Sequence, residues 1–180
     1  MISKKMAEAL NAQVNAEMYS AYLYLSMAAD FEDKNLAGFA HYLYIQAQEE
    51  FGHAARFYNY INEQQGKVRL AAIDAPETEW VNPVAVFEEV YAHEQLVTNL
   101  VNNLVALAME EKDFASNIFL QWFITEQVEE ESNASSLLAK LKMVGDNVQG
   151  LFMMDQELSQ RVAGAVVVPG DGVTGSAAGA

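Results

Sequence analysis

The sequence has no cysteine, only three prolines, and 10 basic residues against 25 acidic ones. Without a thiol, the chain cannot form a disulfide, a zinc–thiolate site, an iron–sulfur cluster or a cysteine nucleophile. The formal net charge of -15 repels nucleic acid phosphates and anionic membranes, so we expect neither as a partner. Any bound metal must use oxygen or imidazole ligands, and cations are the natural partners of such a chain.

Long apolar runs are also missing, although 52% of the residues are hydrophobic. No stretch approaches the ~18 uncharged apolar residues that a membrane-spanning helix needs. The first ten residues mix charged and apolar side chains and lack the apolar core of a secretory signal. The sequence therefore predicts a cytoplasmic protein, and 180 residues suit one domain with a sizeable core.

Hydrophobic periodicity predicts four long helices. Apolar residues recur at intervals of three and four over residues 4–32, 36–62, 84–110 and 113–142. Each run would form a helix of about 40 to 45 Å at 1.5 Å per residue. Such lengths are typical of a helical bundle, and the short link after the first run makes the first two helices antiparallel.

Glycine and proline mark the connections. Gly66, Pro76 and Pro83 indicate a long crossover between the second and third helices, and Gly145 and Gly150 mark a break before a short apolar fifth helix over 151–158. The predicted fold is therefore an all-α four-helix bundle with a long crossover and a short fifth C-terminal helix. We expect one domain over residues 1–161, followed by a Gly/Ala/Val-rich tail over 162–180 that is disordered.

Two carboxylates and one imidazole are expected to meet between the first two helices. Glu17 lies about 17 residues before the turn at Lys34 and Glu50 about 16 residues after it, so antiparallel packing brings them level. His53 follows Glu50 by one helical turn and shares its face, as Tyr24 shares the face of Glu17. Tyr24 is either a packed aromatic or a redox and hydrogen-bonding neighbour of the same centre.

The second half of the chain repeats this plan at a constant offset of 77 residues. The residues that correspond to Glu17, Glu50 and His53 are Glu94, Gln127 and Glu130. Di-metal carboxylate bundles take one Glu from each of two helices and a Glu-x-x-His pair from each of the other two. The first half fits that pattern and the second half departs from it, so we expect two metals that are held unequally.

Buried carboxylates cost several kcal/mol each unless cations compensate them. Oxygen ligands with one imidazole suit iron or manganese. A third, weaker cation site is also predicted where residues of the fourth helix face the second, unless these groups form a solvated acidic face: Glu49, Glu126, Glu129 and Glu130. His41 and His93 are expected to be surface or packing residues, and Trp122 a core residue.

Three segments resemble prokaryotic non-haem ferritins: NAEMYSAYLYL at 15–25, QAQEEFGH at 46–53 and FLQWFITEQVEEE at 119–131. The resemblance extends from about residue 4 to residue 161. It implies a first iron held by Glu17, Glu50 and His53, with Glu50 bridging to a second iron held by Glu94 and Glu130, and with Gln127 beside it. It also implies that the acidic residues of the predicted third site bind iron: Glu49, Glu126, Glu129 and Glu130.

The family resemblance implies that the chain stores iron and has ferroxidase activity. Its members oxidise Fe(II) with O2 at a di-iron centre and store ferric mineral in a shell of 24 identical subunits, with the fifth helix at the four-fold axis. Bacterioferritins bind haem through a Met just before the His; this chain has Gly52 there, so no haem is expected. Two alternatives remain open: a di-iron oxidase or peroxidase without storage, and a helical scaffold that buffers metal passively.

Overall fold

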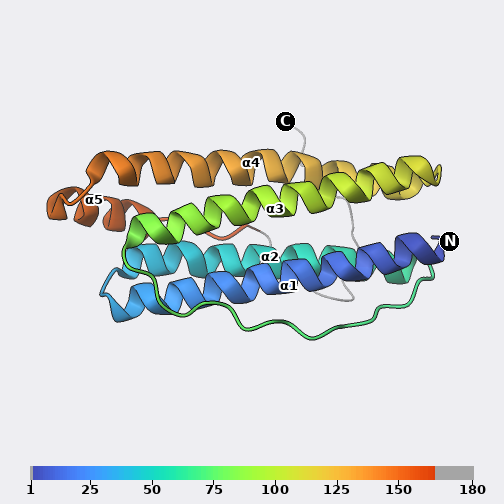
Figure 1. Ribbon diagram of the computed structural model, residues 1–180, viewed down its shortest axis with the longest axis horizontal. Helices are drawn as coiled ribbons and strands as arrows, with labels where there is room; N and C mark the ends of the chain where they lie inside the picture. The colour runs from blue at the N-terminus through green and yellow to red at the C-terminus, as the bar shows by residue number, and fades with distance from the viewer. Residues whose placement is uncertain (1, 165–180) are drawn as a thin grey trace.

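The computed structural model describes residues 2–164 and contains five helices. They are α1 (Lys4–Asp33), α2 (Ala37–Glu63), α3 (Pro83–Glu110), α4 (Phe114–Val144) and α5 (Val148–Leu158). The four long helices lie side by side as two antiparallel pairs, α1 with α2 and α3 with α4, and α5 lies at one end (Figure 1). The predicted four-helix bundle, crossover and fifth helix are confirmed. Of the predicted tail, only residues 162–164 fall within the described range.

Polar side chains fix where several helices begin. The side chains of Ser3, Asn82 and Asp113 each accept a hydrogen bond from a backbone N–H in the first turn of α1, α3 and α4. The fifth helix begins at Val148, earlier than the sequence predicted, because Asn147 caps it through the backbone N–H of Gly150 at 3.1 Å. Gly150, which the sequence marks as part of a break, therefore lies inside the helix.

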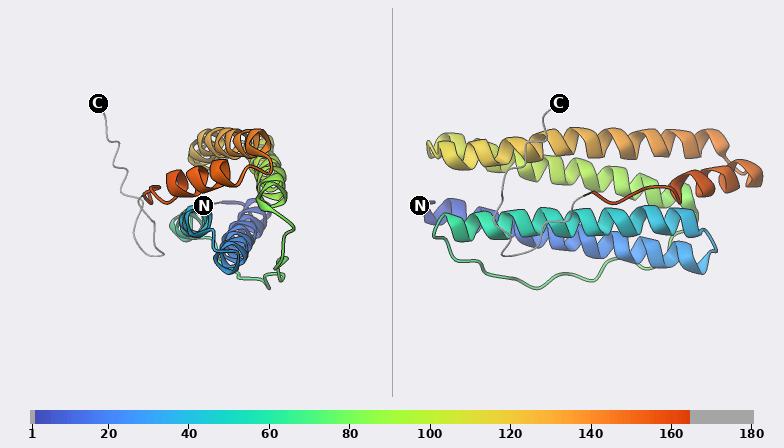
Figure 2. Two further views of the ribbon diagram at one scale, coloured as in Figure 1. Left: turned by 90° about the vertical axis from the view of Figure 1, so that its left-hand side faces the viewer. Right: turned by 180° about the vertical axis from the view of Figure 1, so that it is seen from behind.

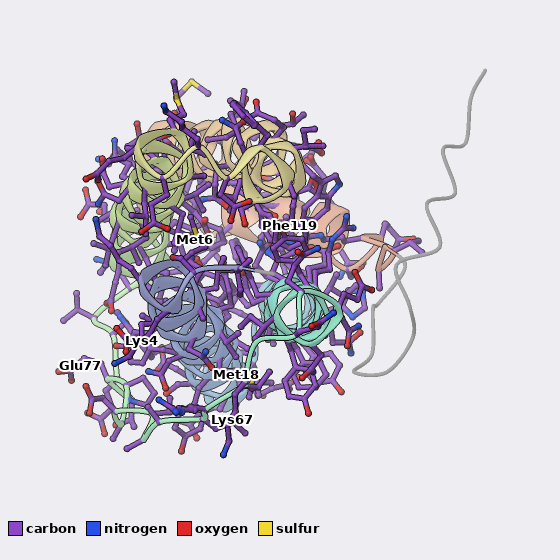
Figure 3. The ribbon with its side chains drawn as sticks, turned by 90° about the vertical axis from the view of Figure 1, so that its right-hand side faces the viewer. Lys4, Met6, Met18, Lys67, Glu77 and Phe119 are labelled. Carbon is purple, nitrogen blue, oxygen red and sulfur yellow. The ribbon has the colours of Figure 1, made fainter. Side chains whose placement is uncertain are left out.

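The crossover over 64–82 runs along the outside of α1 for the length of the bundle (Figures 1 and 2). Asn11 holds its first part: Nδ2 donates to the carbonyl oxygen of Lys67 at 3.0 Å and Oδ1 accepts from the backbone N–H of Arg69 at 2.5 Å. Ser26 Oγ donates to the carbonyl oxygen of Glu77 at 2.6 Å. Lys67 and Glu77 lie at the periphery in the end-on view of Figure 3. The crossover thus joins the two helix pairs without entering the core.

The core consists of two apolar clusters with a polar layer between them. One cluster contains Phe31, Phe39 and Phe87, and the other contains Phe57 and Phe123. Between these clusters the four long helices bury the polar side chains expected from the sequence: Glu17, Glu50, His53, Glu94 and Gln127. Because buried polar groups need partners, this layer is where chemistry is expected. No helix within residues 2–164 is both long and apolar enough to cross a bilayer.

An aspartate of α5 fixes this helix to the start of α2. Asp155 Oδ1 accepts from the backbone N–H groups of Gly38 at 2.7 Å and Phe39 at 3.1 Å, which are two of the donors that a helix N-terminus leaves free. The approach is close, since a Cβ on Gly38 would lie 1.7 Å from the carbonyl oxygen of Asp155. Met154 and Leu158 add to the first cluster. The position of α5 is thereby set by one cap and two core residues.

Candidate metal centre

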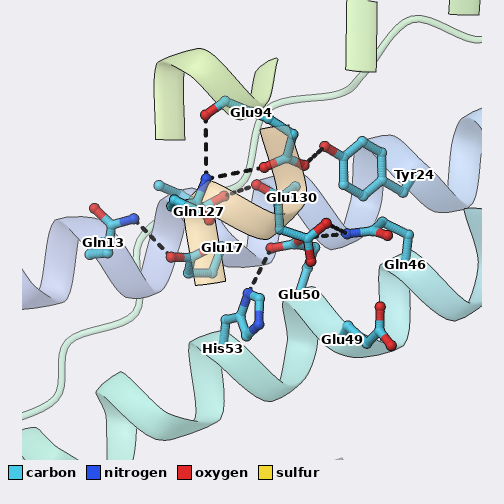
Figure 4. A network of polar contacts seen from close by, with 12 residues as sticks. Gln13, Glu17, Tyr24, Gln46, Glu49, Glu50, His53, Glu94, Gln127 and Glu130 are labelled. Atoms are coloured by element: carbon cyan, nitrogen blue, oxygen red, sulfur yellow. Dashed lines mark hydrogen bonds and ion pairs between the residues drawn. The ribbon is translucent and has the colours of Figure 1, made fainter. Parts of the chain in front are cut away.

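Glu17 of α1 and Glu50 and His53 of α2 form a buried cluster in the polar layer (Figure 4). Their side chains come from residues that are 1%, 2% and 6% exposed, and one ligand atom of each lies within 4.8 Å of the others. His53 Nδ1 lies 3.2 Å from Glu50 Oε2. The structure therefore brings together the two carboxylates and the imidazole that the sequence predicted to converge.

One oxygen of this cluster has no partner. Gln13 Nε2 donates to Glu17 Oε1 at 2.8 Å, but Glu17 Oε2 is buried without a hydrogen bond. Within residues 2–164, the other buried side-chain atom in this condition is Arg56 Nε. No N–H or hydroxyl donor in that range reaches Glu17 Oε2, and this oxygen faces the Glu50 carboxyl, so the two carboxyls satisfy one another only while one of them keeps its proton. A cation bound between them would replace that proton, and the oxygen-and-imidazole donor set suits iron.

The second half of the predicted site lies against the first but is occupied by hydrogen bonds. The Tyr24 hydroxyl donates to Glu94 Oε1, and Gln127 Nε2 donates to Glu94 Oε2 at 3.2 Å. Gln46, which the sequence analysis did not single out, donates through Nε2 to both Glu50 Oε1 at 3.2 Å and Glu130 Oε2 at 2.8 Å. Both halves therefore belong to one network (Figure 4).

The two halves differ in how open they are to a metal. Among the described residues, Glu17, Glu50 and His53 are the possible metal ligands whose atoms lie within 4.8 Å of one another. Glu94 and Glu130 are not part of this cluster. Each oxygen of Glu94 already accepts one hydrogen bond, from a hydroxyl or an amide, so a cation would bind through the remaining lone pairs. The unequal binding of two metals, expected from the Gln127-Val-Glu-Glu130 sequence, stays a prediction.

Burial and mutual repulsion raise the pKa values of the clustered carboxyl groups. Burial, with the neighbouring charge of Glu50, raises the pKa of Glu17 to about 8. Burial, with the charges of Glu50 and Glu94, raises the pKa of Glu130 to about 8. Burial also raises the pKa values of Glu50 and Glu94. Without a cation the cluster holds protons at neutral pH, and a cation must displace them.

The four acidic residues of the predicted third site line one cavity of about 280 Å³ beside His53: Glu49, Glu126, Glu129 and Glu130. Two arginines that the sequence analysis did not assign to the site, Arg56 and Arg161, line the same cavity. Arg161 forms an ion pair with Glu49. The site is therefore an acidic cavity that already contains two cationic side chains.

Aromatic contacts surround the centre. The guanidinium carbon of Arg56 lies 3.6 Å from the ring centroid of Trp122, whose ring meets His53 edge-on with centroids 5.4 Å apart. Trp122 is thus half-buried at the edge of the core, where it covers His53, rather than a plain core residue. His93 packs against Tyr24 with ring centroids 5.8 Å apart, which agrees with the packing role predicted for it, and burial lowers its pKa to about 4.

Known proteins with this fold and sequence are ferritins. The protein-family model for the ferritin-like domain matches residues 7–144 of this chain. A bacterial non-haem ferritin of Bacteroides fragilis is 45% identical over 161 residues, covering 89% of this chain and all of the relative, and one of Campylobacter jejuni is 38% identical over 156 residues, covering 87% and 93%. The open pore ferritin of the archaeon Archaeoglobus fulgidus superposes with a TM-score of 0.89 at 49% identity, covering 90% of this chain and 100% of the ferritin.

These similarities agree with the buried Glu, Glu and His cluster and with the five-helix topology. The family match covers α1 from residue 7 onward and all of α2, α3 and α4, and the relatives are matched over nearly their whole length. The chain therefore belongs to the bacterial non-haem ferritin family.

Proposed function

We propose that this chain is a ferroxidase that oxidises Fe(II) with O2 and stores the ferric product inside a homo-oligomeric shell. The observation that carries the proposal is the unpaired, buried Glu17 Oε2 beside Glu50 and His53. Iron is here the substrate and the cargo. The cytoplasmic location and the absence of haem remain predictions from the sequence.

The residues of the centre would first bind Fe(II) by releasing protons. Glu17, Glu50 and His53 would hold the first Fe(II), with Glu50 shared with a second Fe(II) that Glu94 and Glu130 hold. Because the pKa values of Glu17 and Glu130 are raised to about 8, these groups exchange protons for Fe(II) at neutral pH. Gln127 and Tyr24 would hold Glu94 in position as the metal binds.

Oxidation would then transfer two electrons. Each of two Fe(II) ions gives one electron, and one O2 accepts both and leaves with two protons as hydrogen peroxide. The negative carboxylates favour the ferric state, since they stabilise the added charge. Trp122 and the apolar clusters on either side limit the access of water to the centre. Glu49, Glu126 and Glu129 would form, with Glu130, a third iron site from which the product moves to storage.

Apolar side chains on the outer surface support assembly into a shell. Tyr22, Tyr44 and Phe51 on α1 and α2 are 50%, 51% and 39% exposed and line an apolar groove. Phe152 and Met153 of α5 are exposed too. Exposed apolar surface of this kind is typical of subunit interfaces. We propose a 24-subunit shell, which at 19.9 kDa per subunit has a mass of ~480 kDa.

The test is Fe(II) oxidation after anaerobic loading. A Glu50→Ala, His53→Ala double variant should lose the rapid rise in ferric absorbance after O2 is added, because it lacks the shared carboxylate and the imidazole. Glu63→Ala, which removes an exposed carboxylate from the same helix, is the matched control and should keep the wild-type rate. Equal rates in all three proteins would contradict the proposed centre.

Particle mass and iron content separate storage from the alternatives. A shell that holds many more iron ions per subunit than the three proposed positions supports storage. A dimer that oxidises Fe(II) but retains only these few ions would instead be a di-iron oxidase or peroxidase. A protein that binds iron without accelerating its oxidation would be a passive buffer.

A further inference from the structure

The segment after α5 returns along α2 and places one arginine at the acidic cavity. Arg161 donates through its guanidinium to Glu49 Oε2 and to Gln46 Oε1, the latter at 2.8 Å. The guanidinium carbon also lies 4.2 Å from the ring centroid of Tyr42. With both ionic side chains only 20% and 22% exposed, the Arg161–Glu49 pair is better shielded than a surface ion pair.

We propose that Arg161 is a tethered cation that competes with iron for Glu49, so that a metal ion enters the third site only when the segment after α5 releases this carboxylate. The inference rests on the proposed function, because it concerns the third iron site of the same centre. It assigns a role to a part of the chain that the oxidation chemistry does not use.

Charge in the cavity supports competition. Glu49, Glu126 and Glu129 offer carboxylates, and the nearby cations are Arg56 and Arg161. Arg56 stacks on Trp122 and so stays on α2 beside that ring. Arg161, in contrast, is carried by a segment without secondary structure, and it binds the Glu49 oxygen that a metal would use. If Arg161 is removed, the Glu49 carboxylate becomes available to a metal ion.

The contacts that hold the segment make this arrangement specific. Asp155 anchors α5 to the start of α2, so the chain leaves α5 beside that helix. His41 Nε2 then lies 2.9 Å from the carbonyl oxygen of Arg161, and the backbone N–H of Gly164 donates to Glu49 Oε1 at 3.4 Å. Glu49 is therefore bound through both oxygens by the segment that follows α5.

Arg161 also orients an amide at the buried centre. A guanidinium has only donors, so Gln46 must turn Oε1 toward Arg161 and Nε2 toward the carboxylates. That orientation directs Nε2 to Glu50 Oε1 and Glu130 Oε2. When Arg161 is released, Gln46 is free to turn. Its hydrogen bonds to Glu50 and Glu130, one carboxylate from each half of the centre, can then break. Arg161 is in this respect a positioning residue that couples the third site to the centre.

The experiment measures Zn(II) binding to the full-length assembled protein by calorimetry, because Zn(II) is not oxidised and the readout is independent of activity. Arg161→Gln removes the tethered charge and should tighten the third, weakest Zn(II) per subunit by ~10-fold. Arg161→Lys keeps a positive charge and should stay near the wild-type affinity. Lys5→Gln removes the same charge from an exposed pair with Glu110, whose residues do not line the acidic cavity, and should change nothing.

The outcomes separate this inference from the proposed function. Two tight Zn(II) ions with a third whose affinity changes less than ~3-fold in Arg161→Gln would overturn the inference and leave the two-metal centre standing. Absence of the two tight ions in the wild type would overturn the proposed function itself. A third ion missing from both the wild type and Arg161→Gln would also overturn the inference.

Hydrogen exchange provides a second test. Filling the third site with Zn(II) in the wild type should increase amide exchange over residues 159–164, because Arg161 and Gly164 lose Glu49. Exchange in α5 should stay the same, since Asp155 still caps α2. Unchanged exchange over 159–164 at saturating Zn(II) would show that the metal and Arg161 do not compete.

Discussion

Metal binding to this centre should release protons in a number that depends steeply on pH. The perturbation is the addition of Zn(II) to the metal-free protein, up to saturation of the first two positions. Glu17 and Glu130, both with pKa values raised to about 8, carry protons at pH 6.5 that a metal must displace. The direction follows from burial, which disfavours the charged carboxylate until a cation arrives.

The magnitude follows from these two pKa values. A group with a pKa of about 8 is ~97% protonated at pH 6.5 and ~24% protonated at pH 8.5. Glu17 and Glu130 together should therefore release about two protons per subunit at pH 6.5 and about half a proton at pH 8.5. Glu50, whose pKa is also raised by burial, adds to the number at the lower pH.

The assay is calorimetric titration in buffers with different ionisation enthalpies, in which the slope gives the protons released. Glu17→Gln, measured at saturating Zn(II), should release about one proton fewer at pH 6.5, because its amide carries no titrating proton. Fewer than about one proton per subunit from the wild type at pH 6.5, or equal numbers at both pH values, would refute the reasoning.

The same carboxyl groups make the stability of the metal-free protein depend on pH. Glu17 is protonated up to about pH 8 in the folded chain but ionises near 4.5 once unfolded. The contribution of Glu17 to the free energy of unfolding is complete below pH 4.5. It is lost as the pH rises toward 8, by about 1.4 kcal/mol per pH unit for each such group. Unfolding of the metal-free protein should therefore become easier between pH 5 and 8, and saturating Zn(II) should abolish this trend.

Two further substitutions test the packing and the second half of the centre. Gly38→Ala should detach α5, because the new Cβ would meet the backbone of Asp155; amide exchange over α5 should rise, and unchanged exchange would contradict the docking. Tyr24→Phe removes the donor that lowers the pKa of Glu94, so the second Zn(II) should bind about tenfold more weakly at pH 7, while the exposed Tyr22→Phe should bind normally. Equal affinity in both tyrosine variants would remove Tyr24 from the centre.

Regular features of the sequence predicted the bundle and the meeting of its polar residues. Equal distances from the turn place Glu17 and Glu50 at the same depth of an antiparallel pair, and the 77-residue offset places Glu94 at that depth in the other pair. These arguments need only helical geometry, so they succeed wherever the helices are long and uninterrupted. The roles of these residues in iron chemistry stay predictions until they are tested.

Helical periodicity does not predict the contacts that irregular segments make. Nothing in the periodicity indicates that Asp155 caps α2, and that contact determines where Arg161 lies. Gln46 could have been noticed because it lies one helical turn before Glu50, but its second hydrogen bond depends on a partner helix. Gly150 was read as a break because glycine disfavours helices, whereas the cap at Asn147 outweighs that cost.

The outer crossover has a consequence for the chain's connectivity. Residues 70–75 are exposed, while Asn11 and Ser26 hold the crossover on either side of them. Each helix pair is thus complete without the covalent link between them. A chain cut within residues 70–75, or a circular permutant whose new termini lie there, should still assemble its two helical hairpins around the polar layer. In that sense the protein is built as two halves that meet across a buried layer of polar side chains.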